Sequence, residues 1–408
     1  MRFLIKKNIY LLAILILFFL RFIKPFFYVR LSNVDLSRIG GIYHLDWEIS
    51  KKKYVGFKSI DIFFYSDSKN LANTYWKKIW SDQVILIKVP HFIISIIQDL
   101  KKNQLLQDIL IKNIKINING KELELFQKTK SKNIIKKNNF LLNCVLNNKY
   151  ANVKIYEKDI VKGEKFLKSI GAENKKIICI HNRDDAYLNN VDSSRDWSYH
   201  NFRDFNINDF EDTIIKMIHR GYFVIRMGSI SKDKINFKDK NFFDYSNSDF
   251  RSDFLDIFLL SKCKFLISSD SGISAISEIF RVPIVYVNKS LHWENHRWSL
   301  AAIVIYKKFF SIQKNRYLTF EESYKLKLGN EDMNQYLKNK QIKIINNTRQ
   351  EILEASIERD DYLNQYIKYS DIDEELQNQY WNIFSPNNLR SKNFRMGNYF
   401  LHKNKSLL

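Results

Sequence analysis

The stretch that decides the fold is Cys263–Asn288, CKFLISSDSGISAISEIFRVPIVYVN. The apolar run Phe265–Ile267 stops abruptly at the polar turn Ser268–Gly272. A helix is predicted from 273 to 280, and a second apolar run follows at Val282–Val287. Strand, turn, helix and strand in this order form the unit of a parallel α/β sheet. A turn of Ser and Gly residues that ends a strand and opens a helix offers backbone N–H groups to an anion, although an ordinary helix cap has the same composition.

Further strands that end in polar residues flank this stretch. Ile177–Ile180 leads into His181-Asn182-Arg183-Asp184-Asp185, Tyr222–Arg226 leads into Met227-Gly228-Ser229, and a short strand at 242–245 ends in Asp244-Tyr245. Helices are predicted between them at 208–220, closed by Gly221, and at 252–261. This alternation predicts a doubly wound α/β sheet.

A first α/β half is predicted upstream. Its strands are expected at 27–31, 59–65 and 84–89, and its helices at 42–52, 72–80 and 91–101. The Lys- and Asn-rich residues 102–149 are expected to form loops and short helices. We therefore predict Rossmann-like domains at 31–165 and 166–345 that face a cleft, followed by C-terminal helices and a tail at 346–408.

Residues 1–30 are predicted to anchor the chain to a membrane. The uninterrupted apolar run, Ile9–Leu20, is shorter than the roughly twenty residues that span a bilayer. Arg21 and Lys24 then interrupt it, and no small-residue cleavage site of a secretory signal follows. The segment is expected either to span, with these cations at the interface, or to lie in one leaflet. A buried core helix is the alternative.

The formal net charge of +22 and the pI of about 9.6 favour anionic partners. Lys residues are scattered along the chain, and no zinc-finger, helix-turn-helix or RNA-binding motif accompanies them, so nucleic acid is not the expected partner. Anionic membranes and phosphorylated substrates fit equally. The three cysteines have no metal-binding spacing and fit a reducing compartment. Cys179 is expected to fill the core.

Several stretches together resemble a family of bacterial glycosyltransferases found in envelope-polysaccharide gene contexts. They are HNRDDAYL (181–188), GYFVIRMGS (221–229), DYSNS (244–248), SDFLDIFLLSKCKFLISSDSG (252–272), NNTRQEI (346–352), SRIGG (37–41) and NTYWKKIW (73–80). More distantly, His181-Asn182-Arg183 and the 252–272 block resemble the His-x-Arg fucosyltransferases of GT-B fold. Some of those enzymes carry two successive Arg residues where this chain has one.

The resemblance implies a GT-B-like pair of Rossmann-like domains, with a nucleotide sugar held mainly by the second. It implies that Arg183 contacts the donor diphosphate and that Ser269, Asp270, Ser271 and Gly272 add phosphate contacts. No metal and no cofactor are expected, because Arg side chains and helix N-termini can stabilise the departing diphosphate.

Each candidate also has a structural alternative. Arg183 has the fork geometry for phosphate, or it pairs with Asp184 or Asp185. His181 orients Arg183 or touches the donor, or it is a satisfied structural histidine. Arg226 is a second phosphate candidate, or an interdomain ion pair. Asp244 and Tyr245 are candidates for nucleoside contacts, with loop capping as the alternative.

A general base is also needed, and the sequence leaves it open. Asp184 and Asp185 lie beside the predicted phosphate site, whereas His44, Asp46 and Glu48 belong to the half expected to face the acceptor. Asp371-Ile372-Asp373 spells a DxD metal motif but is interpreted as an acidic helix N-terminus.

The sequence thus predicts a glycosyltransferase, anchored at the cytoplasmic side of a bacterial inner membrane. Its donor is expected to be a nucleotide sugar, and its acceptor a lipid-linked or envelope glycan. The alternatives are a non-catalytic glycan-binding or envelope-assembly protein of the same fold, and a nucleic-acid-binding protein.

Overall fold

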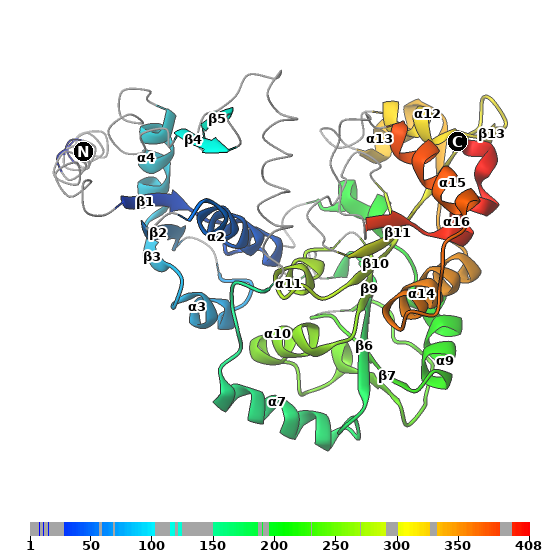
Figure 1. Ribbon diagram of the computed structural model, residues 1–408, viewed down its shortest axis with the longest axis horizontal. Coiled ribbons are helices and arrows are strands. Elements are labelled where there is room, and N and C mark those ends of the chain that lie inside the picture. The colour runs from blue at the N-terminus through cyan, green and yellow to red at the C-terminus, as the bar shows by residue number, and fades with distance from the viewer. Residues whose placement is uncertain are drawn as a thin grey trace. The chain divides into compact units, whose positions relative to one another are not determined.

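A computed structural model divides the chain into two compact units, Met1–Lys154 and Ile155–Leu408 (Figure 1). Residues 155–165, assigned above to the first domain, belong to the second unit. The structure describes residues 8, 11, 15, 28–56, 59–67, 70–102, 115–118, 121–124, 150–186, 190, 196–229, 231–269, 271–290, 301–326, 333–383 and 394–408.

The first unit contains a parallel sheet in the order β1 (Tyr28–Asn33), β2 (Ser59–Ser66) and β3 (Ile85–Val89). Tyr28 pairs with Ser59 and Ile62 with Ile85. Its other elements are η1 (Ile39–Ile42), α2 (Tyr43–Val55), α3 (Tyr75–Trp80), α4 (His91–Lys102), β4 (Lys115–Ile118) and β5 (Lys121–Glu124). The described strands of the sheet follow chain order, so a doubly wound topology stays a prediction for this unit.

One prediction for the first unit was wrong. Within 102–149, expected to hold loops and short helices, β4 and β5 form an antiparallel hairpin. Alternation in Lys-Ile-Asn-Ile and in Lys-Glu-Leu-Glu is the strand signal, but each run is only four residues long. Such short runs carry too little periodicity to be distinguished from loop.

The second unit is built on a seven-stranded parallel sheet whose order reverses in the middle. The order is β15-β11-β10-β9-β6-β7-β8, so successive strands run outward from β6 in one direction and from β9 in the other. The strands are β6 (Lys176–His181), β7 (Tyr222–Arg226), β8 (Phe242–Asp244), β9 (Leu266–Ser268), β10 (Ile284–Lys289), β11 (Ala302–Tyr306) and β15 (Phe394–Met396). This confirms the predicted doubly wound sheet.

Helices cover both faces of this sheet. In Figure 1, α7 (Glu157–Ser169), α10 (Asp253–Lys262) and α11 (Ser274–Ile279) lie on one side, and α9 (Glu211–His219) and α14 (Arg349–Leu363) on the other. Every residue of β7, β10 and β11 is buried, as a sheet covered on both faces requires. Gly163 lets α7 pack closely on α10, because a Cβ there would lie 2.3 Å from the Phe258 ring.

Local signals account for the ends of several helices. Ser252 caps α10 through the N–H of Leu255, and Thr348 with Glu351 forms the predicted capping box of α14. Gly221 adopts φ 87°, the left-handed conformation expected after a helix. Its placement explains why β7 begins immediately afterwards.

Residues 346–408 do more than form helices and a tail. Strand β15 joins the edge of the main sheet, pairing Phe394 with Ala302.

A separate antiparallel sheet is formed by β12, β13 and β14, and Figure 1 labels β13 near the C-terminus. The remaining elements of the unit are η3 (Ser198–Arg203), η4 (Ile207–Phe210), η5 (Tyr245–Asn247), β12 (Lys308–Ser311), β13 (Arg316–Tyr317), β14 (Ile342–Ile345), α12 (Phe320–Lys325), α13 (Met333–Asn339), α15 (Asp371–Asn382), α16 (Asn398–Lys403) and η6 (Lys405–Leu407).

The predicted membrane anchor lies almost wholly outside the described residues. Within the part of the chain that the structure describes, no helix combines the length and the apolar character needed to cross a bilayer. Membrane attachment therefore stays a prediction.

Candidate functional site

The candidate site lies where the strand order of the second unit reverses. Strands β6 and β9 are neighbours there, and His181 pairs in register with Ser268. Their connections leave in opposite directions, so the polar residues that follow them are not covered by a crossover helix. In open α/β sheets, ligands bind at the carboxyl ends of the strands at this point.

His181 is held by two hydrogen bonds that join three strand ends. Its Nδ1 lies 3.1 Å from the carbonyl oxygen of Met227, and its Nε2 lies 3.0 Å from Ser271 Oγ. The pKa of His181 is lowered to about 4, mainly by burial and in smaller part by the charges of Arg226 and Arg183, against the opposing effects of the Met227 carbonyl and Asp184. The imidazole is therefore neutral at physiological pH, and both its nitrogens are engaged.

Arg183 follows β6 and is fixed through both its backbone and its side chain. Its N–H donates to Ser269 Oγ at 3.1 Å, and its Nη1 forms a short ion pair with Asp204. The side chain is 11% exposed, and burial lowers its pKa although Asp204 opposes this shift. Asp184 and Asp185 are the ion-pair partners expected from sequence, and the structure places Asp204 in that role.

Asp204 was not recognised in the sequence. It follows η3, and its backbone oxygen accepts from buried Lys307 at 2.8 Å, which fixes its position. Burial raises the pKa of its carboxyl group to about 6, against the opposing charge of Arg183. No local sequence pattern predicts these contacts, because Arg183 and Lys307 lie 21 and 103 residues away from Asp204 along the chain.

Asp184 and Asp185 hold a neighbouring loop. Asp184 accepts from the N–H of Ala186 at 3.1 Å and from the N–H of Lys232 at 3.0 Å. Asp185 lies 3.7 Å from Lys232 Nζ. Asp184 is thus committed to backbone donors, which favours a structural role over the base predicted from sequence.

Arg226 and Asp244 form an ion pair at the ends of β7 and β8. Arg226 Nη1 donates to Asp244 Oδ2 at 3.1 Å, and the arginine side chain is fully buried. Its Nε and Nη2 find no acceptor among the described residues. Asp244 also accepts from Ser246 and Asn247, so its carboxylate already has three donors. The structure supports a positioning role for Asp244 more than the predicted contact with a nucleoside.

Tyr245 does not reach the surface. Its side chain is fully buried, and its hydroxyl group lies 2.9 Å from Asp256 Oδ1 and accepts from the N–H of Ser252. The prediction that Tyr245 contacts a nucleoside was therefore wrong. Although Tyr245 follows the end of β8, its side chain is part of the hydrophobic core.

The turn after β9 places its residues differently. Ser269 is fully buried and accepts from Arg183, whereas Ser271 is half-buried and Gly272 is exposed. Asp270 lies outside the described residues. Only Ser271 and Gly272 of the described residues in this turn are open to a ligand.

In the first unit, the acidic candidates on α2 are structural. Asp46 is fully buried and accepts from Asn152 Nδ2 at 2.7 Å, and Glu48 pairs with Lys51. His44 is exposed, and its ring meets the edge of Phe63 at 6.2 Å between centroids. None of the three lines the pocket of this unit.

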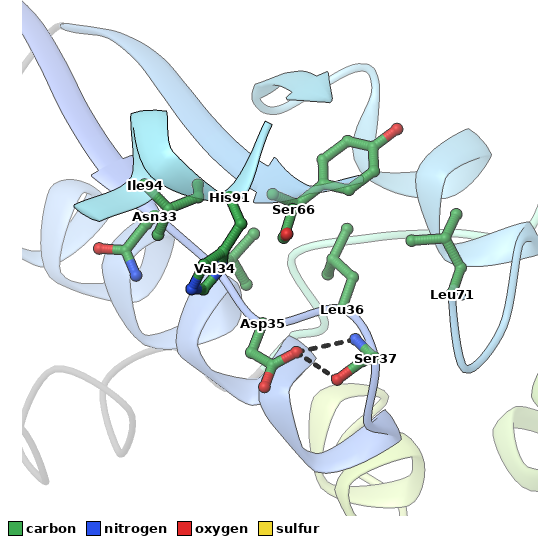
Figure 2. Close-up of a pocket in the computed structure, with 10 residues that line it drawn as sticks. Asn33, Val34, Asp35, Leu36, Ser37, Ser66, Leu71, His91 and Ile94 are labelled. Atoms are coloured by element: carbon green, nitrogen blue, oxygen red, sulfur yellow. Dashed lines mark hydrogen bonds between the residues drawn. The ribbon is translucent and has the colours of Figure 1, made fainter. Parts of the chain in front are cut away.

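That pocket lies at the carboxyl ends of β1 and β2 and encloses about 140 Å³ (Figure 2). Asp35 accepts from the N–H of Ser37 at 3.0 Å and from its hydroxyl at 2.5 Å. His91, the first residue of α4, also lines the pocket (Figure 2). None of its lining residues is Lys or Arg; they are Asn33, Val34, Asp35, Leu36, Ser37, Tyr65, Ser66, Leu71, His91 and Ile94.

The DxD sequence serves helix α15, as predicted. Asp371 is its first residue, and Asp373 completes a capping box with Ser370. Asp373 also lies 2.7 Å from His402 Nε2. Across the described ranges, no three His, Cys, Asp or Glu side chains gather as a metal site would require. Cys179 is fully buried in β6, as expected.

No protein-family model matches this chain, and no curated protein matches it. Among solved structures, a family 9 glycosyl transferase from Veillonella parvula DSM 2008 is 12% identical with a TM-score of 0.42, over 68% of this chain and 86% of that one. The ADP-heptose LPS heptosyltransferase II of E. coli is 9% identical with a TM-score of 0.38, over 68% and 90%. The wall teichoic acid polymerase TagF is 15% identical with a TM-score of 0.24, over 63% and 70%.

By name, these neighbours are a glycosyl transferase, an LPS heptosyltransferase and a wall teichoic acid polymerase. Likeness of this extent defines neither the fold nor the activity of this chain. The similarity to fucosyltransferases stays a prediction.

Proposed function

We propose that the chain is a glycosyltransferase that moves a sugar from a nucleotide-sugar donor to a lipid-linked or envelope glycan. One observation supports this most strongly: the residues predicted from sequence to hold the donor form two hydrogen-bonded pairs, His181 with Ser271 and Arg183 with Ser269, at the reversal of strand order. Nucleotides bind at such a position in doubly wound sheets.

Arg183 is the residue that we assign to the diphosphate. Transfer of the sugar leaves negative charge on the departing diphosphate, and a guanidinium fork matches two phosphate oxygens. Asp204 and the Ser269 hydroxyl hold Arg183 from its side-chain and backbone ends. The arginine is therefore positioned before the donor arrives, which reduces the cost of ordering it.

In this proposal, Arg226 contributes its positive charge from a buried position, without contacting the phosphate. Its guanidinium is fully buried beside His181, and two of its nitrogens, Nε and Nη2, have no acceptor among the described residues. A buried cation favours a nearby anion through the poorly screened interior. Direct contact with phosphate, as predicted from sequence, would require it to become exposed.

We place the acceptor at the pocket of the first unit. The pocket carries hydroxyl, amide and carboxylate groups with apolar walls, a combination that suits a sugar hydroxyl group. Asp35 and His91 are the two side chains there that can take up a proton. They replace His44, which does not line this pocket.

The test combines binding and turnover. Purified protein is screened by thermal shift against nucleoside diphosphates and then incubated with the corresponding nucleotide sugars. A donor-binding transferase gains thermal stability with one nucleoside diphosphate and releases it from the nucleotide sugar in the presence of an acceptor extract. Stabilisation by glycans alone, or tight binding of generic duplex at physiological salt, would support the alternative functions instead.

Attachment to the cytoplasmic side of the inner membrane is also part of the proposal. It rests on the composition of residues 1–30. A variant that lacks residues 1–27 should move to the soluble fraction on cell breakage and keep its affinity for the donor. Retention of that variant in the membrane fraction would contradict the proposed anchor.

A further inference from the structure

The hydrogen bonds of His181 determine where its proton lies. Nδ1 faces the carbonyl oxygen of Met227, which has no proton to give, so Nδ1 carries the hydrogen. A neutral imidazole has one N–H, and the burial of His181 keeps it neutral. Nε2 is therefore an acceptor and faces Ser271 Oγ at 3.0 Å.

The hydroxyl proton of Ser271 is consequently committed to His181. A serine hydroxyl group has one proton and two lone pairs, so Ser271 Oγ has only lone pairs left for other partners. Ser271 is half-buried, and next to it Gly272 is exposed, so the oxygen lies at an accessible edge of the sheet. Toward a ligand, Ser271 acts as an acceptor.

This excludes the role that its position in the turn first indicated. The oxygens of an ionised diphosphate are acceptors, and two acceptors facing each other repel. Serine hydroxyls that bind phosphate must give their proton to it, and here the proton is directed to Nε2. The ligand group opposite Ser271 must instead be a donor.

We infer that Ser271 is a specificity residue that accepts a hydrogen bond from a hydroxyl group of the donor, on its ribose or on its sugar. The inference rests on the proposed function, because it takes the ligand to be a nucleotide sugar. His181 is the positioning residue that turns the hydroxyl, and Met227 O fixes the tautomer of His181. Arg183 remains the diphosphate contact.

The two serines of the turn thus have opposite roles. Ser269 accepts from the N–H of Arg183 and is fully buried, so it shapes the loop that carries the arginine. Ser271 gives its proton to His181 and offers its lone pairs outward. A substitution at Ser271 should therefore change discrimination between ligands without disturbing Arg183.

The experiment measures binding of matched ligands to the full chain and to Ser271→Ala by calorimetry. The ligands are the nucleoside diphosphate found by thermal shift, its 2′-deoxy and 3′-deoxy analogues, its nucleotide sugar and inorganic pyrophosphate. An acceptor that the bound ligand shields from water is left unsatisfied when the ligand lacks the matching donor, so loss of the contacted hydroxyl should weaken binding about tenfold in the natural chain. In Ser271→Ala that difference should disappear, while pyrophosphate binding stays unchanged.

The ligands also distinguish the two sources of the hydroxyl. If it belongs to ribose, one deoxy analogue shows the loss. If it belongs to the sugar, neither analogue does, and Ser271→Ala weakens the nucleotide sugar but not the nucleoside diphosphate. Equal weakening of every ligand, including pyrophosphate, would show that Ser271 contacts phosphate and would overturn the inference.

A second variant tests the role of His181. In His181→Gln the side-chain amide can donate to Ser271 Oγ, which releases the serine proton toward the ligand. The affinities for the ligand with the hydroxyl group and for the analogue that lacks it should then differ less. The melting temperature of the variant should stay close to that of the natural chain. Unchanged discrimination in both variants would overturn the inference but leave the proposed function intact. Failure of the natural chain to bind any nucleotide would overturn both.

Discussion

The two units present the carboxyl ends of parallel strands in contrasting ways. In the first unit, these ends line a pocket with Asp35, Ser37 and His91 and without Lys or Arg among its lining residues. In the second unit, they carry Arg183 and a neutral His181 above buried Arg226. Polar groups follow the strands in both cases, but arginine side chains, which the proposed diphosphate contact requires, occur at the second edge and not among the residues that line the first pocket.

Buried donors without an acceptor among the described residues occur in both units, such as Trp80 Nε1 in the first and two nitrogens of Arg226 in the second. In the first unit, buried Asp46 accepts from Asn152, whose amide also donates to Ser50, so these groups satisfy one another. In the second unit, Arg226 keeps Nε and Nη2 without an acceptor among the described residues. Unsatisfied buried donors cost stability, and they are retained most readily where a ligand compensates for them.

The largest effect is expected from Arg183→Ala. Loss of the charged fork should lower turnover of the nucleotide sugar about 100-fold, the usual cost of removing one donor to a developing anion. Arg316→Ala is the matched control, since Arg316 is an exposed arginine on β13 that pairs with Glu322 of α12. Diphosphate-release assays on both variants check this.

Arg183→Lys guards against an indirect effect on folding. It keeps the charge opposite Asp204 but loses the fork, so the protein should melt normally and still turn over slowly. If Arg183→Ala matched the control in turnover, the edge of the second unit would not be the diphosphate site.

Asp35→Asn should produce the next largest loss of transfer, and it tests whether the two units have different roles. The amide oxygen of Asn keeps the turn with Ser37 but no longer takes up a proton, so transfer to the acceptor should fall about tenfold or more. The affinity for nucleoside diphosphate should not change, because this pocket belongs to the other unit. Asp82→Asn, at an exposed turn, is the control. A loss of nucleotide affinity in Asp35→Asn would contradict the assignment of the acceptor to the first unit and of the donor to the second.

The Arg183–Asp204 pair should make donor affinity depend on pH. Burial raises the pKa of Asp204 to about 6, so its carboxylate becomes protonated as the pH falls and stops neutralising Arg183. Affinity for the nucleotide sugar should therefore rise about threefold to tenfold between about pH 7.5 and pH 5.5. Asp204→Asn should abolish this dependence, and calorimetry at several pH values measures it.

The same group affects folding with a defined sign. The folded chain holds the Asp204 proton more tightly than the unfolded chain, whose pKa is about 3.9. The resulting stabilisation is present below that pKa and is lost as the pH rises through about 6. Relative to Asp204→Asn, the natural chain should lose stability across this window. An increase in the stability of the natural chain relative to Asp204→Asn as the pH rises would contradict the assigned burial.

The smallest effect is expected from Tyr245→Phe. Removing the hydroxyl group leaves Asp256 and the N–H of Ser252 with one fewer partner and should cost about 1–2 kcal/mol of the free energy of unfolding. Nucleotide affinity should stay the same, because Tyr245 is fully buried. Urea denaturation and calorimetry measure the two quantities. A large loss of affinity at unchanged stability would restore the original prediction of a nucleoside contact.

The sequence contained much of the second unit. Long apolar runs that end in polar turns marked β6, β7 and β9, and Gly221 and Thr348 marked helix ends, because these signals act over a few neighbouring residues. The same signals located His181, Arg183 and Ser271 at strand ends. The order of the strands then brought these residues together.

What the sequence did not show depends on distant partners. Asp204 matters because it meets Arg183 across a loop, and β15 becomes a strand only against β11. By type and position, Tyr245 was a candidate nucleoside contact and Asp46 a candidate general base, and both are buried in structural roles. Side-chain type indicates what a residue can do, whereas tertiary packing decides whether a ligand can reach it.

Hydrogen exchange with and without a nucleotide sugar tests the central claim most directly. Donor binding at the edge of the second unit should slow exchange of the backbone amides at 181–185 and 268–274. Amides at 33–37 should be unaffected until the acceptor is added. Protection at 33–37 by the donor alone, with no change at 181–185, would contradict the account.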